Sequence, residues 1–286
     1  MNQKKIAPFY LVLTALFWSM NGVLIKYIPW SAFTCAIIRG TITFVCISLV
    51  CRCKVWKIKM NRYKLMCSIC YLLQGLLFHV AMKYTTAANA TVLQNTSPLY
   101  IMGFNALLLH KYPKRQDLTA CVTLLLGVGL AFAGSVNGGG TIGNCIALIS
   151  ALFYAGVFFL SKMPQVGDAI EPVILGNGYY VLMLPLCCLD SAFPNPEPSV
   201  WAAQIVLSLV CGAGAWILFS KGIKHTSALT ANFITMIEPV GGAVLTFLFL
   251  NERPTALSLV GCSIVLVTLV FYNLWQAKAV QGEPAE

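Results

Sequence analysis

Two charged side chains lie inside long apolar runs of this sequence, where a charge is unfavourable. Glu238 is the only acidic residue well within such a run, and Arg39 lies within another. An ionisable residue inside a membrane is a functional candidate, because it must be protonated, paired or hydrated there. Glu238 could carry a proton or bind a substrate amine, or it could be neutralised by protonation or by a nearby Ser or Thr. Arg39 could bind a substrate carboxylate, pair with Glu238, or reach the membrane interface.

Polar side chains also accompany two prolines at matching positions. Thr91, Gln94 and Asn95 precede Pro98, and helical spacing places them on one face. The residues 141 positions later are Asn232, Thr235, Met236 and Pro239. We expect each proline to remove a backbone hydrogen bond and to kink its helix near the middle. Polar groups at equal depth in both halves predict a central substrate site. The alternatives are that the prolines only shape packing and that the amides only bond to neighbouring helices.

Two aromatic residues and a histidine complete the candidate site. Trp18 in the segment ALFW matches Tyr154 in the segment ALFY, so the two rings are predicted to flank a cavity from opposite halves. Aromatic walls suit a quaternary ammonium group or an aromatic side chain, although ordinary helix packing explains them almost as well. His79 is a second candidate for proton coupling, but a lone histidine in an apolar helix is more often a hydrogen-bonded packing residue.

Membrane helices must position these residues. Of the 286 residues, 58% are hydrophobic and 10% are charged. The polar residues are too few to cover the surface of a soluble protein of this size. Apolar runs of about 20 residues are long enough to span a bilayer as helices, and the alternating polarity of a barrel strand is missing. We predict an all-α membrane protein with ten transmembrane helices. The runs are Pro8–Ile28, Ala32–Cys51, Leu65–Lys83, Ala88–His110, Leu118–Ser135, Ile142–Lys162, Pro172–Leu189, Val200–Gly222, Ala228–Leu250 and Ala256–Trp275.

The loops predict how the chain is oriented. The net charge of +10 lies mainly in short loops, above all Arg52–Lys64, and not on a polar face that would bind nucleic acid. Placing this loop in the cytoplasm places both termini there and leaves only Lys26, Lys83 and Arg253 outside. We therefore expect a multi-pass protein of the bacterial inner (plasma) membrane with cytoplasmic N- and C-termini.

One unit occurs twice in the chain. With an offset of 141, the segment Tyr84–Pro113 matches His225–Pro254 at positions that include Pro98 and Pro239. We predict two five-helix repeats, residues 1–136 and 137–286, joined by a linker that contains Gly138–Gly140. Since five is odd, the second repeat must cross the membrane in the opposite sense, an inverted arrangement found in many secondary transporters.

These residues resemble those of the drug/metabolite transporter superfamily, in its ten-span form with two EamA repeats. The resemblance covers essentially the whole chain. It rests on ALFW followed by Lys26, on Arg39-Gly40, on the small-residue-rich spans with Pro98 and Pro239, and on the ending LNERPTALSLVGCSIVL. The first repeat departs from the pattern, because Lys111 replaces the Glu of the Glu-Arg pair and Ala120 replaces the following Gly. The resemblance implies transport, but the superfamily includes exporters of amino acids and other metabolites, importers of small amines and sugar-nucleotide exchangers.

We therefore expect a secondary transporter that moves a small polar metabolite, an amino acid or amine, by alternating access. Export with possible proton coupling is the first hypothesis, and import of a small amine such as a quaternary ammonium compound is the alternative. A non-transport membrane protein and an enzyme are disfavoured. No cofactor or metal is expected, since Cys67-x-x-Cys70 lacks a second pair. The expected partners are a small-molecule substrate and the lipid bilayer, with the protein a monomer or homodimer.

Overall fold

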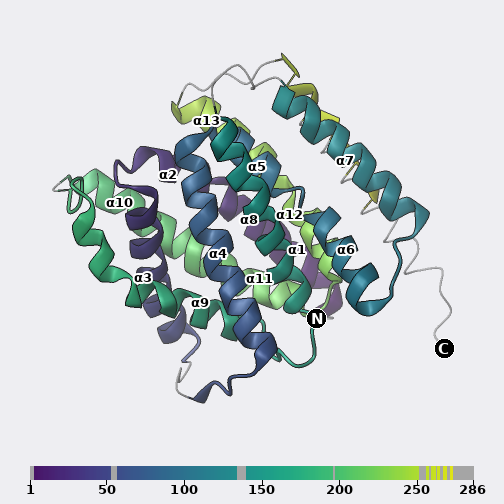
Figure 1. The fold of residues 1–286 in the computed structure, drawn as a ribbon, viewed down its shortest axis with the longest axis horizontal. Coiled ribbons are helices and arrows are strands. Elements are labelled where there is room, and N and C mark those ends of the chain that lie inside the picture. The colour runs from purple at the N-terminus through teal and green to yellow at the C-terminus, as the bar shows by residue number, and fades with distance from the viewer. Residues whose placement is uncertain are drawn as a thin grey trace.

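All regular secondary structure in the described part of the chain is helical (Figure 1). The computed structural model describes residues 3–52, 57–133, 140–195 and 197–250, and beyond these only 256–257, 259–261, 263–264, 267–268 and 271–272. The helices are α1 (Gln3–Ser19), α2 (Asn21–Tyr27), α3 (Ala32–Val50), α4 (Arg62–Tyr84), α5 (Ala87–Gln94), α6 (Ser97–Leu109), α7 (Arg115–Ala133), α8 (Thr141–Leu160), α9 (Ile170–Leu182), the 3₁₀ helix η3 (Leu184–Leu189), α10 (Pro198–Val206), the π-helical segment η4 (Leu207–Gly214), α11 (Ala215–Ile223), α12 (Ala228–Thr235) and α13 (Ile237–Leu250). Helix α4 crosses the middle of the bundle and α7 lies at one edge. The Glu-Arg pair of the ending and most of the glycine linker lie outside the described residues.

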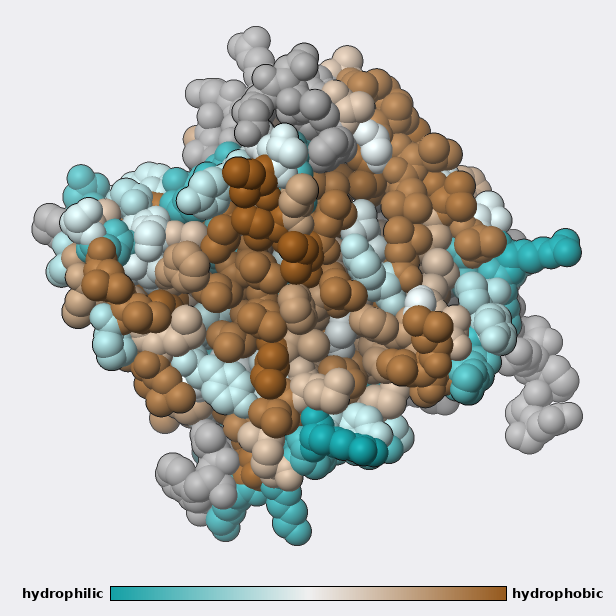
Figure 2. Space-filling model, viewed as in Figure 1, coloured by the Kyte–Doolittle hydropathy of each residue, from teal (hydrophilic) through white to brown (hydrophobic). Residues whose placement is uncertain are grey.

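Six helical spans among these residues are long and apolar enough to cross a bilayer. They are Ile6–Tyr27, Ala32–Val50, Arg62–Tyr84, Thr141–Leu160, Pro198–Ile223 and Ala228–Phe249. Apolar side chains cover much of the face shown in Figure 2, as a surface in contact with lipid requires. Six of the ten predicted runs therefore contain a candidate span among the described residues. Two of the other runs are divided, one between α5 and α6 and one between α9 and η3, and the last run lies largely outside the described residues.

Two interrupted helices occur at equivalent positions of the two repeats. Helix α5 ends at Gln94 before α6 begins at Ser97, and α12 ends at Thr235 before α13 begins at Ile237. The bounds of α5 and α12 differ by 141 at both ends (228 − 87 and 235 − 94). Pro98 and Pro239 lie in the first turn of α6 and α13, so each proline lies at the start of a helix and does not bend one in its interior. A first-turn position suits proline, because the N–H groups there have no partner within the helix.

Helices α4 and α8 are antiparallel and pack along their length. At one end a methyl group on Gly143 would lie 2.7 Å from the carbonyl carbon of Tyr84. In the middle the Ser150 hydroxyl donates to the carbonyl oxygen of Gln74 at 3.0 Å. Small residues on α8 therefore allow the backbones to approach closely, as is usual where membrane helices meet.

The two ends of α4 contact different loops. At its start the Asn61 side chain donates to the carbonyl oxygen of Gln165 at 2.7 Å. At its end the Lys83 ammonium donates to the carbonyl oxygen of Ile28 at 2.6 Å. The loops that we expect in the cytoplasm thus meet at the first end, and those that we expect outside meet at the second.

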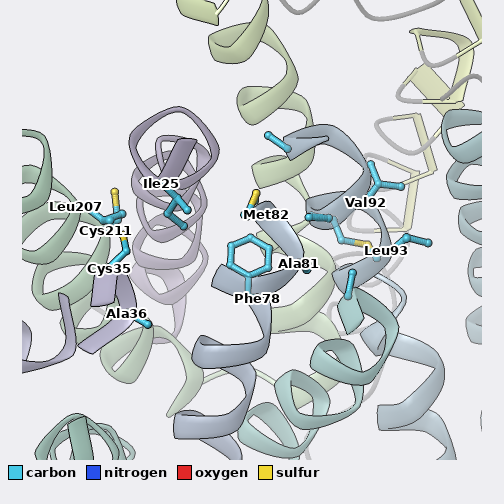
Figure 3. Close-up of a cluster of buried hydrophobic side chains, with 14 of the residues drawn as sticks. Ile25, Cys35, Ala36, Phe78, Ala81, Met82, Val92, Leu93, Leu207 and Cys211 are labelled. Carbon is cyan, nitrogen blue, oxygen red and sulfur yellow. The ribbon is translucent and has the colours of Figure 1, made fainter. Parts of the chain in front are cut away.

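A buried apolar cluster surrounds α4 (Figure 3). Phe78, Ala81 and Met82 of α4 lie between side chains of α2, α3 and η4 on one side and side chains of α5 on the other. Phe78 also lines the cavity described below. The cluster therefore fixes α4 against both interrupted helices of the first repeat, α1–α2 and α5–α6.

Candidate functional site

A small cavity lies where α1, α2, α3, α4, α5, α8, α11 and α13 meet. Its volume of about 20 Å³ leaves room for about one water molecule. The lining residues are Trp18, Asn21, Arg39, Gln74, Gly75, Phe78, Gln94, Tyr154, Trp216 and Glu238. Both repeats contribute to this wall, so the cavity is formed only when they pack together.

The first span is interrupted beside the cavity. Helix α1 ends at Ser19 and α2 begins at Asn21, with Met20 between them. The Ser19 hydroxyl donates to the backbone oxygen of Glu238 at 3.2 Å, and a methyl group on Gly241 would collide with Ser19. This close approach brings Asn21 next to the start of α13.

Glu238 lies in the first turn of α13 with only 3% of its surface exposed. The N-terminus of a helix carries a partial positive charge, which favours an acidic side chain there. The side chain of Asn21 also interacts with the Glu238 carboxyl group. A carboxyl group so placed can hold a proton or accept hydrogen bonds from a substrate.

Arg39 reaches the same cavity from α3. Its Nη2 donates to the carbonyl oxygen of Cys211 at 3.2 Å, within η4. A π-helical segment alters the usual backbone pairing, which can free a carbonyl group for a side chain, and such segments are frequent at functional sites. The Arg39 guanidinium attracts Glu238 electrostatically, but in the described part of the chain no ion pair within 4 Å joins them.

An amide network forms another wall of the cavity. The Gln94 amide donates to the Ser150 hydroxyl at 2.8 Å and to the Gln74 side-chain oxygen at 3.3 Å. Gln94 is the last residue of α5, so this network satisfies polar groups at the helix interruption. Bonds between helices of this kind fix their relative position in a membrane.

Aromatic rings close the cavity on a further side. The rings of Trp18 and Tyr154, which occupy matching positions of the two repeats, meet edge-on with centroids 5.9 Å apart. Trp216 packs against Trp18 at 4.9 Å. The π-face of such a ring in a cavity wall can attract a cation.

Five of the nine predicted substrate-binding residues line the cavity and four do not. The five are Trp18, Arg39, Gln94, Tyr154 and Glu238. Of the four, Thr91 and Thr235 bond to carbonyl oxygens of their own helices, Asn95 donates to the carbonyl oxygen of Thr91 at 2.8 Å, and Asn232 bonds to Ser97.

The remaining candidates also lie outside the cavity wall. Nδ1 of His79 lies 2.7 Å from the carbonyl oxygen of Gly75, which itself lines the cavity. Pro98 borders a separate hollow of about 10 Å³ beside α7. Pro239 follows Glu238 in the first turn of α13.

The sequence prediction missed half of the lining residues. They are Asn21, Gln74, Gly75, Phe78 and Trp216. Asn21 and Gln74 carried a usable signal, since each is a polar residue within a predicted apolar run. Gly75 and Phe78 carried none, because only the packing of α4 turns them toward the cavity. Among the described residues no cluster of three or more His, Cys, Asp or Glu side chains could hold a metal ion.

Comparison with known proteins identifies the family. The model of the EamA-like transporter family matches residues 5–133 and 141–274. The uncharacterized transporter YwfM of Bacillus subtilis is 24% identical over 98% of this chain and 98% of its own length. The uncharacterized inner membrane transporter YicL of Salmonella typhimurium is 23% identical, covering 92% and 93%. A solved crystal structure, 15% identical, superposes with a TM-score of 0.73 over 97% of this chain and 99% of that one, which shows a shared fold. The chain therefore belongs to the EamA-like transporter family, as a multi-pass membrane transporter of the drug/metabolite superfamily with two EamA domains.

Proposed function

We propose that this secondary transporter moves a small polar metabolite of the amino acid or amine class. The observation that supports this best is that Glu238 and Arg39 line one buried cavity while no ion pair within 4 Å joins them in the described part of the chain. Removing two charges from water is unfavourable unless each gains a partner. A zwitterion supplies both partners at once, an ammonium for the carboxylate and a carboxylate for the guanidinium.

Transport proceeds in this proposal by alternating access between two inverted five-helix repeats, residues 1–136 and 137–286, with ten spans in all. Helix α12 begins and ends 141 positions after α5 begins and ends, which supports the two repeats. The antiparallel packing of α4 and α8 supports the inversion. In a chain whose spans alternate in direction, the first and third spans are parallel. Helix α4 is the third span of the first repeat, and α8 is the first span of the second. If the second repeat were not inverted, α8 would run in the same direction as the first span of the chain, and therefore parallel to α4.

The cavity volume supports a closed intermediate in this cycle. A volume of about 20 Å³ holds a water molecule but no amino acid. Three of the spans that line it are interrupted, at Met20, at Asn95 and Thr96, and at Met236. Interrupted helices at the binding site are typical of secondary transporters, and short segments can move where a continuous helix would have to tilt as a whole. Opening toward either side then enlarges the cavity for substrate.

Export is the proposed direction, with Glu238 as the group that couples it to protons. A buried carboxyl group that alternates between two sides of a membrane can exchange a proton for a substrate amine. The basic loops favour cytoplasmic termini, and the inner membrane named for the Salmonella relative is the proposed location. The protein acts as a monomer or homodimer.

A second function, import of a small amine such as a quaternary ammonium compound, has one observation in its favour. The rings of Trp18, Tyr154 and Trp216 lie beside Glu238 in the same cavity wall. Rings around a carboxylate can hold a cation that has no carboxyl group.

Transport into proteoliposomes tests both functions. Purified protein is reconstituted, and counterflow of radiolabelled amino acids and amines is followed with and without a pH gradient. We expect counterflow of at least one class, accelerated by the gradient, and loss of that acceleration in Glu238→Gln. Asp168→Asn is the matched control, since this exposed carboxylate pairs with Lys224 outside the cavity. An unchanged response in Glu238→Gln removes the proton-coupling role, and counterflow of neither class removes the proposal.

A further inference from the structure

An unsatisfied hydrogen-bond acceptor faces the cavity. Asn21 is 6% exposed and lines the cavity, and its Oδ1 has no hydrogen-bond partner among the described residues. The same side chain interacts with the Glu238 carboxyl group. Two acceptors, one neutral and one acidic, therefore lie side by side in a space too small for more than about one water molecule.

A buried acceptor requires an N–H or O–H donor. An acceptor left unpaired in a site without water weakens binding by about 10- to 100-fold. Sites built to hydrogen-bond a donor reject the analogue that lacks it more strongly than apolar pockets reject a methyl group. The neighbouring Glu238 carboxylate favours a positively charged donor.

Only some amines can supply that donor. A primary or secondary ammonium group can direct one N–H to Glu238 and a second to Asn21. A trimethylammonium group has no N–H and would place methyl groups against both oxygens. The aromatic rings attract either kind of cation, so they do not distinguish between them, whereas Asn21 does.

We propose that Asn21 is a specificity-determining residue that accepts an N–H of the substrate ammonium beside Glu238, so that the transporter takes amines bearing at least two N–H groups and rejects their trimethylated counterparts. The inference rests on the proposed amine or amino acid function, and it decides against the quaternary ammonium alternative. The helix interruption at Met20 explains the position of the amide, because Asn21 begins α2 and lies at the turn next to α13.

Ligand-induced thermal shifts of the purified full-length protein test this inference. The probes are matched pairs that differ only in N-methylation: glycine and glycine betaine, ethanolamine and choline, phenylalanine and its N,N,N-trimethyl derivative. In at least one pair we expect the N–H member to bind at least tenfold more tightly. Asn21→Leu, which keeps the size and removes the acceptor, should reduce that preference to less than about threefold.

Two further variants keep the test decisive. Asn21→Ser retains an acceptor and should preserve the preference if Asn21→Leu fails to fold. Asn105→Leu makes the same change on α6, away from the cavity, and should leave the preference unaltered. Equal or tighter binding of a trimethylated member to the wild type, or an undiminished preference in Asn21→Leu, overturns this inference alone. If no member of any pair binds, the amine or amino acid function is itself rejected.

Discussion

The Asn232 amide donates a hydrogen bond of 2.8 Å to the Ser97 hydroxyl, although 135 positions separate them. The contact joins α12 of the second repeat to the first residue of α6 in the first. At the offset of 141, Asn232 corresponds to Thr91 and Ser97 corresponds to Glu238. The equivalent contact would join Thr91 to Glu238, but the Thr91 hydroxyl bonds instead to the carbonyl oxygen of Ala87 at 2.8 Å. One member of a pair of related contacts is formed and the other is open.

Alternating access by inverted repeats predicts that these two contacts form in turn. Ser97→Ala removes the first and should increase the exposure of the cavity to one side. Thr91→Val removes the second and should increase exposure to the opposite side. The measurement is labelling of a cysteine at Phe78, in a background without other cysteines, by an impermeant maleimide added from either side. Shifts toward the same side in both variants would contradict the exchange of contacts.

Arg39→Gln should weaken the binding of substrates with a carboxyl group more than the binding of amines without one. Because a charge-assisted hydrogen bond contributes about 1.5–3 kcal/mol, loss of the guanidinium should weaken amino acid binding about 10- to 100-fold. Amines without a carboxyl group should lose less than about threefold. Competition between each amino acid and its decarboxylated amine measures the difference. Exposed Arg62→Gln is the control, and equal losses for both ligands would show that Arg39 does not bind the carboxylate.

Gly143→Ala should destabilise the contact between α8 and α4. The added methyl group would lie 2.7 Å from the carbonyl carbon of Tyr84 and 2.8 Å from the backbone nitrogen of Thr85, and neither backbone atom can rotate away. Overpacking of this kind costs about 1–3 kcal/mol. Unfolding in detergent measures the loss. Gly103→Ala on α6 is the matched control, since nothing lies within 4 Å of its added methyl group. A stable Gly143→Ala with a destabilised Gly103→Ala would contradict the close approach of the helices.

Asp190 lies outside the predicted membrane spans, and its ionisation should make the stability of the protein depend on pH. Partial burial opposes its ionisation, but hydrogen bonds from the N–H of Ser31, the Thr34 hydroxyl and the N–H of Ala192 outweigh this and lower the pKa of Asp190 below its ordinary 3.8. A carboxyl group whose pKa is lower in the folded state than in the unfolded state stabilises the protein at pH values above its unfolded-state pKa. This stabilisation is lost as the pH falls through the folded-state pKa.

The wild type should therefore have a higher Tm than Asp190→Asn at pH 6. The difference should shrink as the pH falls from about 4 through the lowered pKa of the folded state, where the folded carboxylate becomes protonated. Thermal unfolding in detergent from pH 6 to pH 3 measures it. A difference that stays constant over this range would mean that the ionised carboxylate does not stabilise the contact with Ser31.

Composition and periodicity determined the helical membrane fold, because apolar runs about 20 residues long fit few other structures. The offset of 141 identified equivalent positions, and Glu238 and Arg39 stood out because charges are rare in apolar spans. All of these are properties of single segments or of their comparison along the chain. They require no knowledge of which segments touch.

The tertiary structure decided which of these residues share a cavity. Helical spacing placed Thr91 and Gln94 on one face, yet only Gln94 meets the Gln74 and Ser150 network. Asn21 reaches Glu238 because the chain is interrupted at Met20 and Gly241 admits Ser19. The contact between Asn21 and Glu238 depends on close packing between segments more than 200 positions apart, and no pattern within one segment specifies that packing.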